Sequence, residues 1–393
     1  MIIDKLMLYG VLLILLGGLW AQSDYEEYLK KKEQAESGMK KDEQRVASGI
    51  KKDEEAENKY RASITAEYEK YELEDKQAFE KFKREVEEKW EEFKSPTKKK
   101  YVEYDDKKES RASVDFENGT ITIEVLLEDG VDPDKAQQKL EDATERIVQS
   151  KGEDNKPLLE NQLETPKKEK ITPSNIQEIS SELIKKDKIQ VEKNHRGDDG
   201  KNRTKFKVVI PMKKNHLDER AKRYEKIVLK YSKKFKVDPA IVFAVIETES
   251  SFNPKAKSHI PAYGLMQLVP KSGARDAYLY VYKKDKYLSK GYLFTPEKNI
   301  ELGCAYLAKI KNVYFKGITD EEKAYICVIP AYNTGIGNVS LTLTGATKLK
   351  AASNAANKMS SKELYKKLTT ELKHKEARDY LTRVWERKKK YDI

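Results

Sequence analysis

A stretch of 72 residues without proline most strongly restricts what this chain can fold into. Residues 23–94 are rich in Glu, Lys, Ala and Gln, and their apolar residues recur at steps of three and four. That spacing aligns them along one face of an α-helix. Residues 37–43 return eleven positions later as residues 48–54, and this period corresponds to 3.67 residues per turn. We therefore expect one long charged helix rather than a disordered segment. It is either a stalk that acts as a spacer, in a coiled coil or alone, or a charged helix without a partner that is frayed at Gly38 and Gly49.

The first 22 residues resemble a targeting segment. An apolar core at residues 6–16 follows Lys5 and precedes small residues that end near Ala21. This order is typical of a secretory signal, although Leu19 is bulky for a position near the cleavage site. An uncleaved anchor is the alternative, although the apolar run is short for a membrane span. Both alternatives place the rest of the chain outside the cytoplasm, with the membrane as a partner if the segment is retained.

The charge distribution favours an anionic polymer as partner. Charged residues make up 37% of the chain and hydrophobic residues only 38%, so part of it is solvated rather than packed. Residues 216–393 carry a net charge of +16, whereas the whole chain carries +11. Such a surface attracts nucleic acid, acidic lipid or peptidoglycan. An extracytoplasmic location argues against nucleic acid.

The cysteines and histidines exclude some classes of protein. Two cysteines are too few for a disulfide-rich scaffold, and the four histidines lack metal-ligand spacing. We therefore expect no metal and no cofactor. Cys304 and Cys327 either pair in an oxidising compartment or are buried free thiols, and the second alternative is favoured.

Residues 95–215 have the pattern of a small α+β accessory domain. Pro96 ends the long helix, and alternating segments flank Asn118-Gly119, which is a strong hairpin signal. Asp132 and Pro133 begin a helix that we expect to end near Gln149. The remaining expected elements are a hairpin at 113–117 and 120–125, a polar linker at 151–174, a helix at 175–186, and strands at 188–194 and 204–211. No catalytic constellation is apparent in this region.

Residues 216–393 have helical patterns separated by loops that contain Gly and Pro. They predict a compact all-α domain. The expected helices are 217–235, 239–250, 296–313, 320–333, 360–369 and 374–391.

One of these helices carries a candidate catalytic acid. Asp238-Pro239 begins a helix whose first two turns are apolar on every side, which predicts a buried helix. Glu249 continues a buried face near its end. Burial raises the pKa of a carboxyl, as a general acid requires near neutral pH. Glu247 also follows an apolar residue, and a solvated glutamate at a helix end is a third option, so position alone leaves the choice open.

The residues around Glu249 resemble the soluble lytic transglycosylase type of domain. The resemblance rests on residues 249–254 (ESSFNP), 264–267 (GLMQ) and 331–335 (AYNTG), with supporting matches at Ala256, Ser258, Pro270, Asn299, Ile300, Gly303 and 305–307. Over residues 86–393 the chain is similar to the family of membrane-bound lytic murein transglycosylase C, and the helix before residue 86 lies outside that similarity.

The resemblance implies a fold and a reaction. It implies that residues 95–215 are an accessory α+β module and that residues 216–393 are an all-α, goose-type lysozyme-like catalytic domain. With the targeting segment (1–22) and the charged stalk (23–94) predicted above, the chain is expected to be multidomain. Glu249 would protonate the oxygen between N-acetylmuramic acid and N-acetylglucosamine in peptidoglycan. It would then act as base on the muramyl 6-hydroxyl, closing a 1,6-anhydro ring without water.

The resemblance also assigns substrate-binding positions. Ser258 and Gln267 fall at cleft positions, and Met266 would line the sugar site unless it is an ordinary core methionine. Tyr332 would place its hydroxyl near Glu249, and Asn333 would brace the turn. The other positions assigned to substrate binding are Ser250, Tyr306 and Tyr380.

Some features depart from the family pattern. Residues 17–22 contain no cysteine for lipidation, so lipid anchoring at the outer membrane is not expected. We expect the chain in the periplasm of the bacterial cell envelope. Pro261 and Pro330 occupy positions that affect the shape of the cleft. Two other functions compete with an envelope lytic transglycosylase in cell-wall remodelling: a goose-lysozyme-like hydrolase, and a non-catalytic peptidoglycan-binding scaffold. Intact Glu249, Gln267 and Tyr332 argue against the scaffold.

Overall fold

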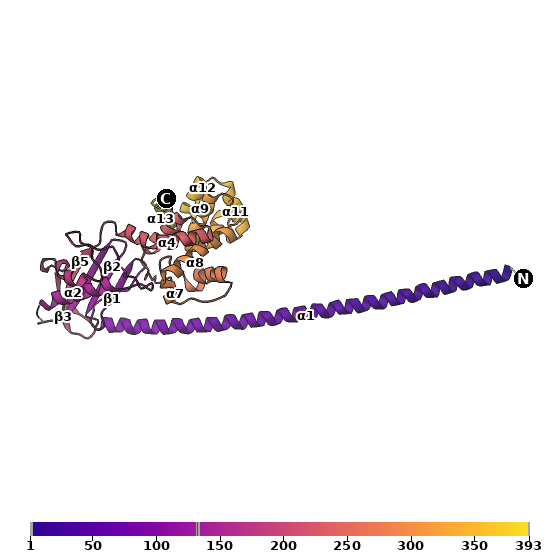
Figure 1. The fold of residues 1–393 in the computed structure, drawn as a ribbon, viewed down its shortest axis with the longest axis horizontal. Helices are drawn as coiled ribbons and strands as arrows, with labels where there is room; N and C mark the ends of the chain where they lie inside the picture. The colour runs from indigo at the N-terminus through magenta and orange to yellow at the C-terminus, as the bar shows by residue number, and fades with distance from the viewer. Residues whose placement is uncertain (1–2, 131, 133, 392–393) are drawn as a thin grey trace. The chain divides into compact units, whose positions relative to one another are not determined.

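The structure is a computed structural model that describes residues 3–130, 132 and 134–391 (Figure 1). Contacts divide the chain into two units, Met1–Lys70 and Tyr71–Ile393. Among the described residues, no helix combines the length and apolarity needed to cross a membrane. The predicted signal or anchor includes residues 1–2, which lie outside the described part, and its cleavage stays a prediction.

The long helix predicted from the apolar spacing is present as α1, Ile3–Glu87. It continues through Gly38 and Gly49, the two positions where the alternative of a helix without a partner predicted fraying. In the unit that ends at Lys70, the side chains of Met39, Val46 and Ile50 are largely exposed.

The end of α1 corrects the prediction, because the helix stops at Glu87 rather than residue 94. Val86 and Trp90 are buried against Leu126 of the sheet. The Trp90 indole donates a 2.8 Å hydrogen bond to the Lys108 carbonyl, and the Arg111 guanidinium lies 4.0 Å from the ring centroid. Tertiary packing therefore ends the helix before Pro96 is reached.

Among the described residues, five strands form one antiparallel sheet in the order β1-β2-β3-β5-β4. They are β1 Lys100–Tyr104, β2 Ser110–Asp115, β3 Thr120–Glu128, β4 Gln190–Arg196 and β5 Asn202–Pro211. The predicted hairpin is confirmed: Asp115 pairs with Thr120, and Gly119 has φ +66°. Edge strand β1 was not predicted from the sequence. Helices α2 (Asp134–Gln149) and α3 (Ile176–Leu183) pack with the sheet around one apolar core.

Residues 151–174 are not the polar linker that we expected. Leu159, Leu163 and Ile171 are buried in the core of the sheet part, and turns with isolated bridges lie between them. These apolar residues follow neither a helical nor a strand period, so a pattern search does not detect them.

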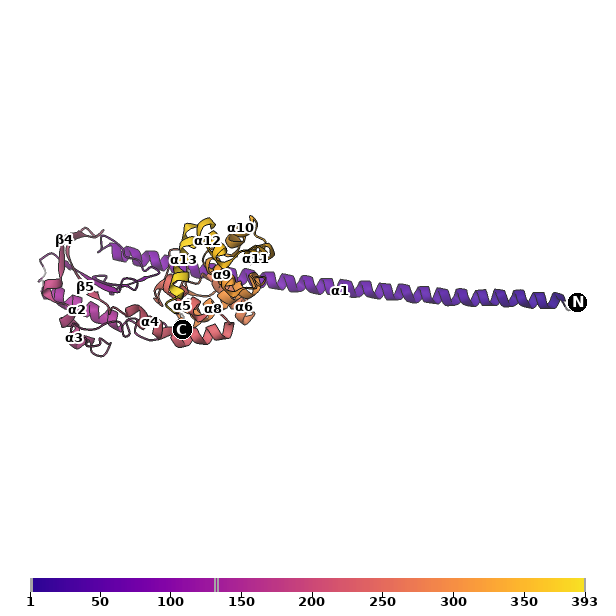
Figure 2. The same cartoon turned by 90° about the horizontal axis from the view of Figure 1, so that it is seen from above.

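The helices of residues 216–393 surround a second core. The longer ones are α4 His216–Phe235, α5 Pro239–Ser250, α8 Pro296–Lys309, α9 Glu321–Thr334, α12 Ser361–Glu371 and α13 Lys375–Lys388. Pro330 lies inside α9 without ending it. Helix α5 is buried and lies beside α13 (Figure 2).

Four short helices were missed by the sequence analysis: α6 Arg275–Tyr282, α7 Lys290–Phe294, α10 Ile336–Thr344 and α11 Leu349–Lys358. Two π-helical turns, Pro270–Ala274 and Ile310–Tyr314, complete this part. Cys304 and Cys327 are buried free thiols, which confirms the favoured alternative.

Buried Arg220 of α4 connects the sheet part (95–215) to the helical part (216–393). Its guanidinium donates hydrogen bonds to the Ser251 carbonyl (3.0 Å), the Gln162 side chain (2.7 Å) and the Phe116 carbonyl. Both parts belong to the same compact unit, and their division into separate domains stays a prediction.

Candidate active site

Helix α5 fixes the position of Glu249. The Asp238 side chain accepts a hydrogen bond from the Ala240 amide (2.8 Å), and Pro239 occupies the first turn, where proline needs no amide hydrogen. Ser251 and Phe252 adopt φ values of 50° and 61°, so the chain turns just after the helix. The carboxyl of Glu249 therefore sits in the last turn of a buried helix.

The structure separates the two glutamates that position alone did not. Glu247 forms an ion pair with Arg387 (3.0 Å) and accepts a hydrogen bond from the Tyr391 hydroxyl, so it joins α5 to the end of α13. Glu249 instead lines a cavity of about 500 Å³. Only Glu249 of this pair has access to a ligand.

Several groups set the pKa of Glu249. Burial raises it, since only 6% of the side chain is exposed, and the negative charge of Glu376 also raises it. Lys98, whose Nζ lies 3.4 Å from Oε2, lowers it, as does the Tyr380 hydroxyl. The pKa remains raised above the ordinary value, which favours the protonated acid.

Four of the predicted substrate-binding residues line the same cavity: Ser258, Gln267, Tyr332 and Asn333. The Gln267 amide nitrogen donates to the carbonyls of Ala256 (3.1 Å) and Gly264 (3.0 Å). Its buried Oε1 has no hydrogen-bond partner within the described part of the chain. That oxygen is therefore a ready acceptor for a ligand hydroxyl or amide.

The two predicted tyrosines lie close to the acid in different ways. The Tyr332 hydroxyl donates a 2.8 Å hydrogen bond to the Met266 carbonyl, while burial and the nearby Glu249 charge raise its own pKa. Tyr380 of α13 is buried, and its hydroxyl approaches the Glu249 carboxyl. That hydroxyl has no partner of regular hydrogen-bond geometry among the described residues.

Three other predicted substrate-binding residues are not among those that line this cavity, and their role in binding stays a prediction. The Ser250 hydroxyl is fully buried and donates to the carbonyls of Ile246 (3.0 Å) and Leu265 (2.8 Å). The Met266 side chain is a core methionine packed against Gly303, where an added Cβ would lie 2.1 Å from the sulfur. Tyr306 packs on the Tyr332 ring, with centroids 5.3 Å apart. Ser250 and Met266 thus lie in the core next to the site, and Tyr306 packs against Tyr332, which lines the cavity.

The sequence analysis missed Lys98 and Glu376, which line the cavity with Glu249. Lys98 lies 151 positions before its partner in the sequence, within a run of three lysines. Glu376 is exposed on the first turn of α13. No pattern near either residue marks it, because only the tertiary fold brings it to the site.

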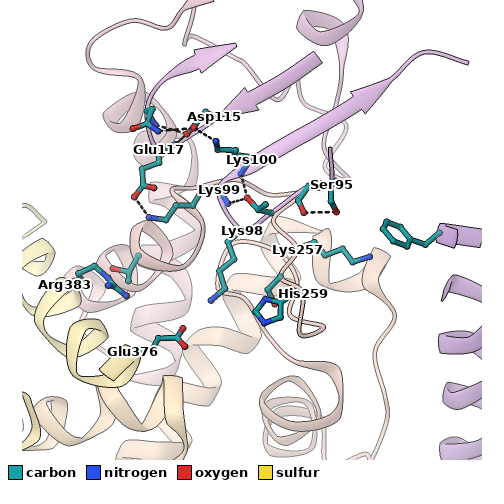
Figure 3. Close-up of a pocket in the computed structure, with 16 residues that line it drawn as sticks. Ser95, Lys98, Lys99, Lys100, Asp115, Glu117, Lys257, His259, Glu376 and Arg383 are labelled. Atoms are coloured by element: carbon teal, nitrogen blue, oxygen red, sulfur yellow. Dashed lines mark hydrogen bonds and ion pairs between the residues drawn. The ribbon is translucent and has the colours of Figure 1, made fainter. Parts of the chain in front are cut away.

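A second cavity of about 1050 Å³ adjoins the first, and Lys98, Ser258, His259 and Glu376 line both. Figure 3 shows Lys98 extending toward the helical part beside His259, with Glu376 and Arg383 across from it. Lys99, Lys100 and Lys257 add positive charge. The described residues contain no group of three or more His, Cys, Asp or Glu side chains able to hold a metal ion.

Comparison with known proteins identifies the class of this fold and site. Residues 226–354 match the transglycosylase SLT domain, so the class is that of a lytic transglycosylase. Residues 64–144 match the N-terminal domain of membrane-bound lytic murein transglycosylase C. This match begins at 64 rather than 86, which corrects the expected limit of the similarity: the last part of α1 belongs to it.

The chain belongs to the membrane-bound lytic murein transglycosylase C family. It is 33% identical to the Salmonella typhimurium member over 293 residues, which are 72% of this chain and 78% of that protein. It is 41% identical to the Klebsiella pneumoniae member over 189 residues, 48% of this chain and 52% of that protein. The 70 kDa soluble lytic transglycosylase of Escherichia coli is a solved structure with 25% identity over 45% of this chain and 25% of its own, at a TM-score of 0.34.

Proposed function

We propose that the protein cleaves the β-1,4 bond between N-acetylmuramic acid and N-acetylglucosamine in peptidoglycan, and that it leaves 1,6-anhydromuramyl ends. The observation that carries this proposal is Glu249, a buried carboxyl of raised pKa on the wall of a cavity. The role is cell-wall remodelling and turnover in the envelope.

In the first step, protonated Glu249 donates its proton to the glycosidic oxygen as the bond from that oxygen to C1 of the muramyl residue breaks. The leaving sugar departs as a neutral alcohol, and C1 gains oxocarbenium character. Glu249, now a carboxylate, is held by Lys98 at 3.4 Å.

In the second step, the 6-hydroxyl of the same muramyl residue attacks C1, and its proton passes to the Glu249 carboxylate. The new O6–C1 bond replaces the broken one, so no water is consumed and the acid is restored. One carboxyl performs both transfers in turn, consistent with microscopic reversibility.

The neighbouring carboxyl of Glu376 supplies the physical basis for the alternative, a hydrolase with two acids of goose-lysozyme type. Glu376 lines both cavities, although it is exposed and Glu249 is buried. A second carboxyl beside the cavity would suit a base that activates water. The family supports the transglycosylase, and the nature of the product separates the two reactions.

The remaining parts have proposed roles around this domain. Residues 216–393 form a goose-type lysozyme-like catalytic domain and residues 95–215 an accessory domain. Helix α1 serves as a stalk, and residues 1–22 direct the chain to the periplasm or anchor it in a membrane. The relatives are named membrane-bound lytic murein transglycosylases, which supports an envelope location.

Replacing the proposed acid tests the function. Glu249→Gln keeps the shape of the side chain and removes its acid, so we expect an unchanged thermal melt and a loss of glycan release from purified sacculi of at least about a hundredfold. Release of muropeptides by the variant at the wild-type rate would contradict the assignment.

A further inference from the structure

The loop before β1 is built into the active site. The Lys98 carbonyl accepts a hydrogen bond from the Asn253 side chain (3.3 Å), and the Thr97 carbonyl accepts one from the Lys257 amide (3.4 Å). The Thr97 hydroxyl accepts from the amides of Lys99 and Lys100 (3.3 and 3.1 Å). These contacts fix the backbone of the loop against the helical part, so the Lys98 side chain starts from a defined point.

The ammonium group of Lys98 differs from those of its two neighbours. Lys99 and Lys100 pair with Glu117 and Asp115 of the sheet part. Lys98 pairs with Glu249, whose side chain is 6% exposed, while its own is 38% exposed. Lys98 lines both cavities, so the residue that pairs with Glu249 also borders the larger cavity.

We propose that Lys98 is a specificity-determining residue that pairs with Glu249 in the free enzyme and with a carboxylate of the bound glycan when Glu249 is neutral. The proposal rests on the function proposed above and deepens it, since it names the chemical group of the substrate that the sheet part recognises.

The charge balance of the reaction supports this exchange. The acid step requires a neutral Glu249, and at that stage Lys98 loses its partner inside a site that the substrate has closed to water. An unpaired, partly desolvated cation is unfavourable, so a substrate anion that takes the place of Glu249 gains affinity. Peptidoglycan carries such anions as carboxylates of the stem peptide. Where the stem has been removed, the muramyl lactyl group carries a free carboxylate instead, because the stem is otherwise joined to that carboxyl as an amide.

The groups that face Glu249 come from several elements. Tyr332 of α9 and Tyr380 of α13 are neutral, since burial raises the pKa of both well above the ordinary value. The other titratable or charged groups lining this cavity are His259, Lys373, His374, Lys375 and Glu376. Glu376 is thus the other carboxyl in the cavity with which Lys98 could pair. If Lys98 paired with Glu376 whenever Glu249 is neutral, a substrate carboxylate would not be needed.

The test measures glycan binding to the full-length protein that carries Glu249→Gln, which mimics the neutral acid and prevents turnover. Three ligands are compared: a muramyl tetrasaccharide with its stem peptides, the same glycan with free lactyl carboxylates, and chitotetraose, which has no carboxylate. Lys98→Met is added to this background. Lys94→Met is the matched control, because Lys94 lies in the same segment, is similarly exposed (32%), pairs with Glu124 and lines neither cavity.

We expect Lys98→Met to weaken binding of a carboxylate-bearing glycan about tenfold and to change chitotetraose binding less than about twofold. Lys98→Arg restores binding. A loss confined to the stem-bearing ligand assigns the anion to the peptide, and a loss confined to the stem-free glycan assigns it to the free lactyl carboxylate. A loss with both muramyl ligands shows that either carboxylate can pair with Lys98.

Equal weakening of all three ligands, or no weakening, would overturn the proposal. Retained chitotetraose binding shows that the variant is folded. Failure of the proposed function is a separate result, because it would appear as cleavage of sacculi by Glu249→Gln itself, whatever the residue at position 98.

Discussion

Two glutamates on one buried helix have different surroundings, and the surroundings assign their roles. Glu247 is satisfied by Arg387 and Tyr391, whereas Glu249 faces a cavity with Lys98 and Tyr380 nearby. A carboxylate that pairs with a cation stabilises the fold, whereas a buried carboxyl that lines a cavity can take part in chemistry.

Substitution of the structural glutamate should therefore affect stability more than chemistry. Glu247→Gln leaves Arg387, which is 23% exposed, without its carboxylate partner. We expect the free energy of unfolding to fall by about 1–3 kcal/mol, while glycan release per folded molecule stays near the wild-type rate. Denaturant unfolding and sacculus digestion measure the two effects. A variant of full stability that cannot cleave would reverse the assignment of the two glutamates.

The cation near Glu249 predicts how activity responds to pH. Burial raises the pKa of Glu249, and Lys98 lowers it. Without the cation, the carboxyl stays protonated to a higher pH. In Lys98→Met the alkaline limb of the kcat/KM profile should therefore move to higher pH, since protonated Glu249 is the active form. Lys94→Met should leave the limb in place. A limb that moves to lower pH, or not at all, is the contrary result.

The sequence was sufficient to predict five of the residues that line the smaller cavity, namely Glu249, Ser258, Gln267, Tyr332 and Asn333, but not all of them. Glu249, Ser258 and Gln267 lie within one short segment, where a motif is visible. Lys98 reaches Glu249 from another part of the fold, and no local period records such a contact. Ser250 and Met266 belong to the same motif as the acid, yet they support the site from the core, because a motif does not distinguish contact with substrate from packing.

At the level of elements, strong local signals gave accurate bounds. Asp238-Pro239 and the turn at Ser251 delimit α5, and Asn118-Gly119 gives the hairpin its register. The end of α1 was misplaced because the buried Trp90 stops the helix through tertiary contacts. Helices α10 and α11 and the packed turns at 151–174 have short or irregular apolar patterns, which sequence periodicity does not detect.

Residues 71–87 at the end of α1 contact both the sheet part and the helical part. These contacts predict how truncated chains should behave. The Tyr71 hydroxyl accepts a hydrogen bond from the Lys290 amide (3.2 Å), Glu72 pairs with Lys271 (2.5 Å), and Val86 is fully buried. A chain that starts at residue 71 should therefore melt like the full chain and cleave sacculi.

A chain that starts at residue 88 lacks these contacts and should lose roughly 3 kcal/mol or more of stability. Thermal melts of the two truncations, with the full chain as reference, measure the difference. Equal melts for both would show that residues 71–87 contribute nothing to the fold.

On the scale of the whole molecule, charge and fold favour the same substrate. The helical part has a net charge of +16 against +11 for the whole chain, and Lys99, Lys100 and Lys257 line the larger cavity, which shares residues with the cavity of Glu249. In the proposed function, long-range attraction would bring an anionic glycan to this surface, and Glu249 would act once the glycan is bound. High salt should slow the capture of sacculi more than the chemical step.

The most direct test of the central claim is the product formed by the full-length protein from purified sacculi in ¹⁸O-labelled water. A transglycosylase closes the ring with the muramyl 6-hydroxyl, so we predict 1,6-anhydromuropeptides that carry no label, by mass spectrometry. Glu249→Gln should give no product above background. Muropeptides with a reducing end that contains ¹⁸O would show that water is the nucleophile and would contradict the account.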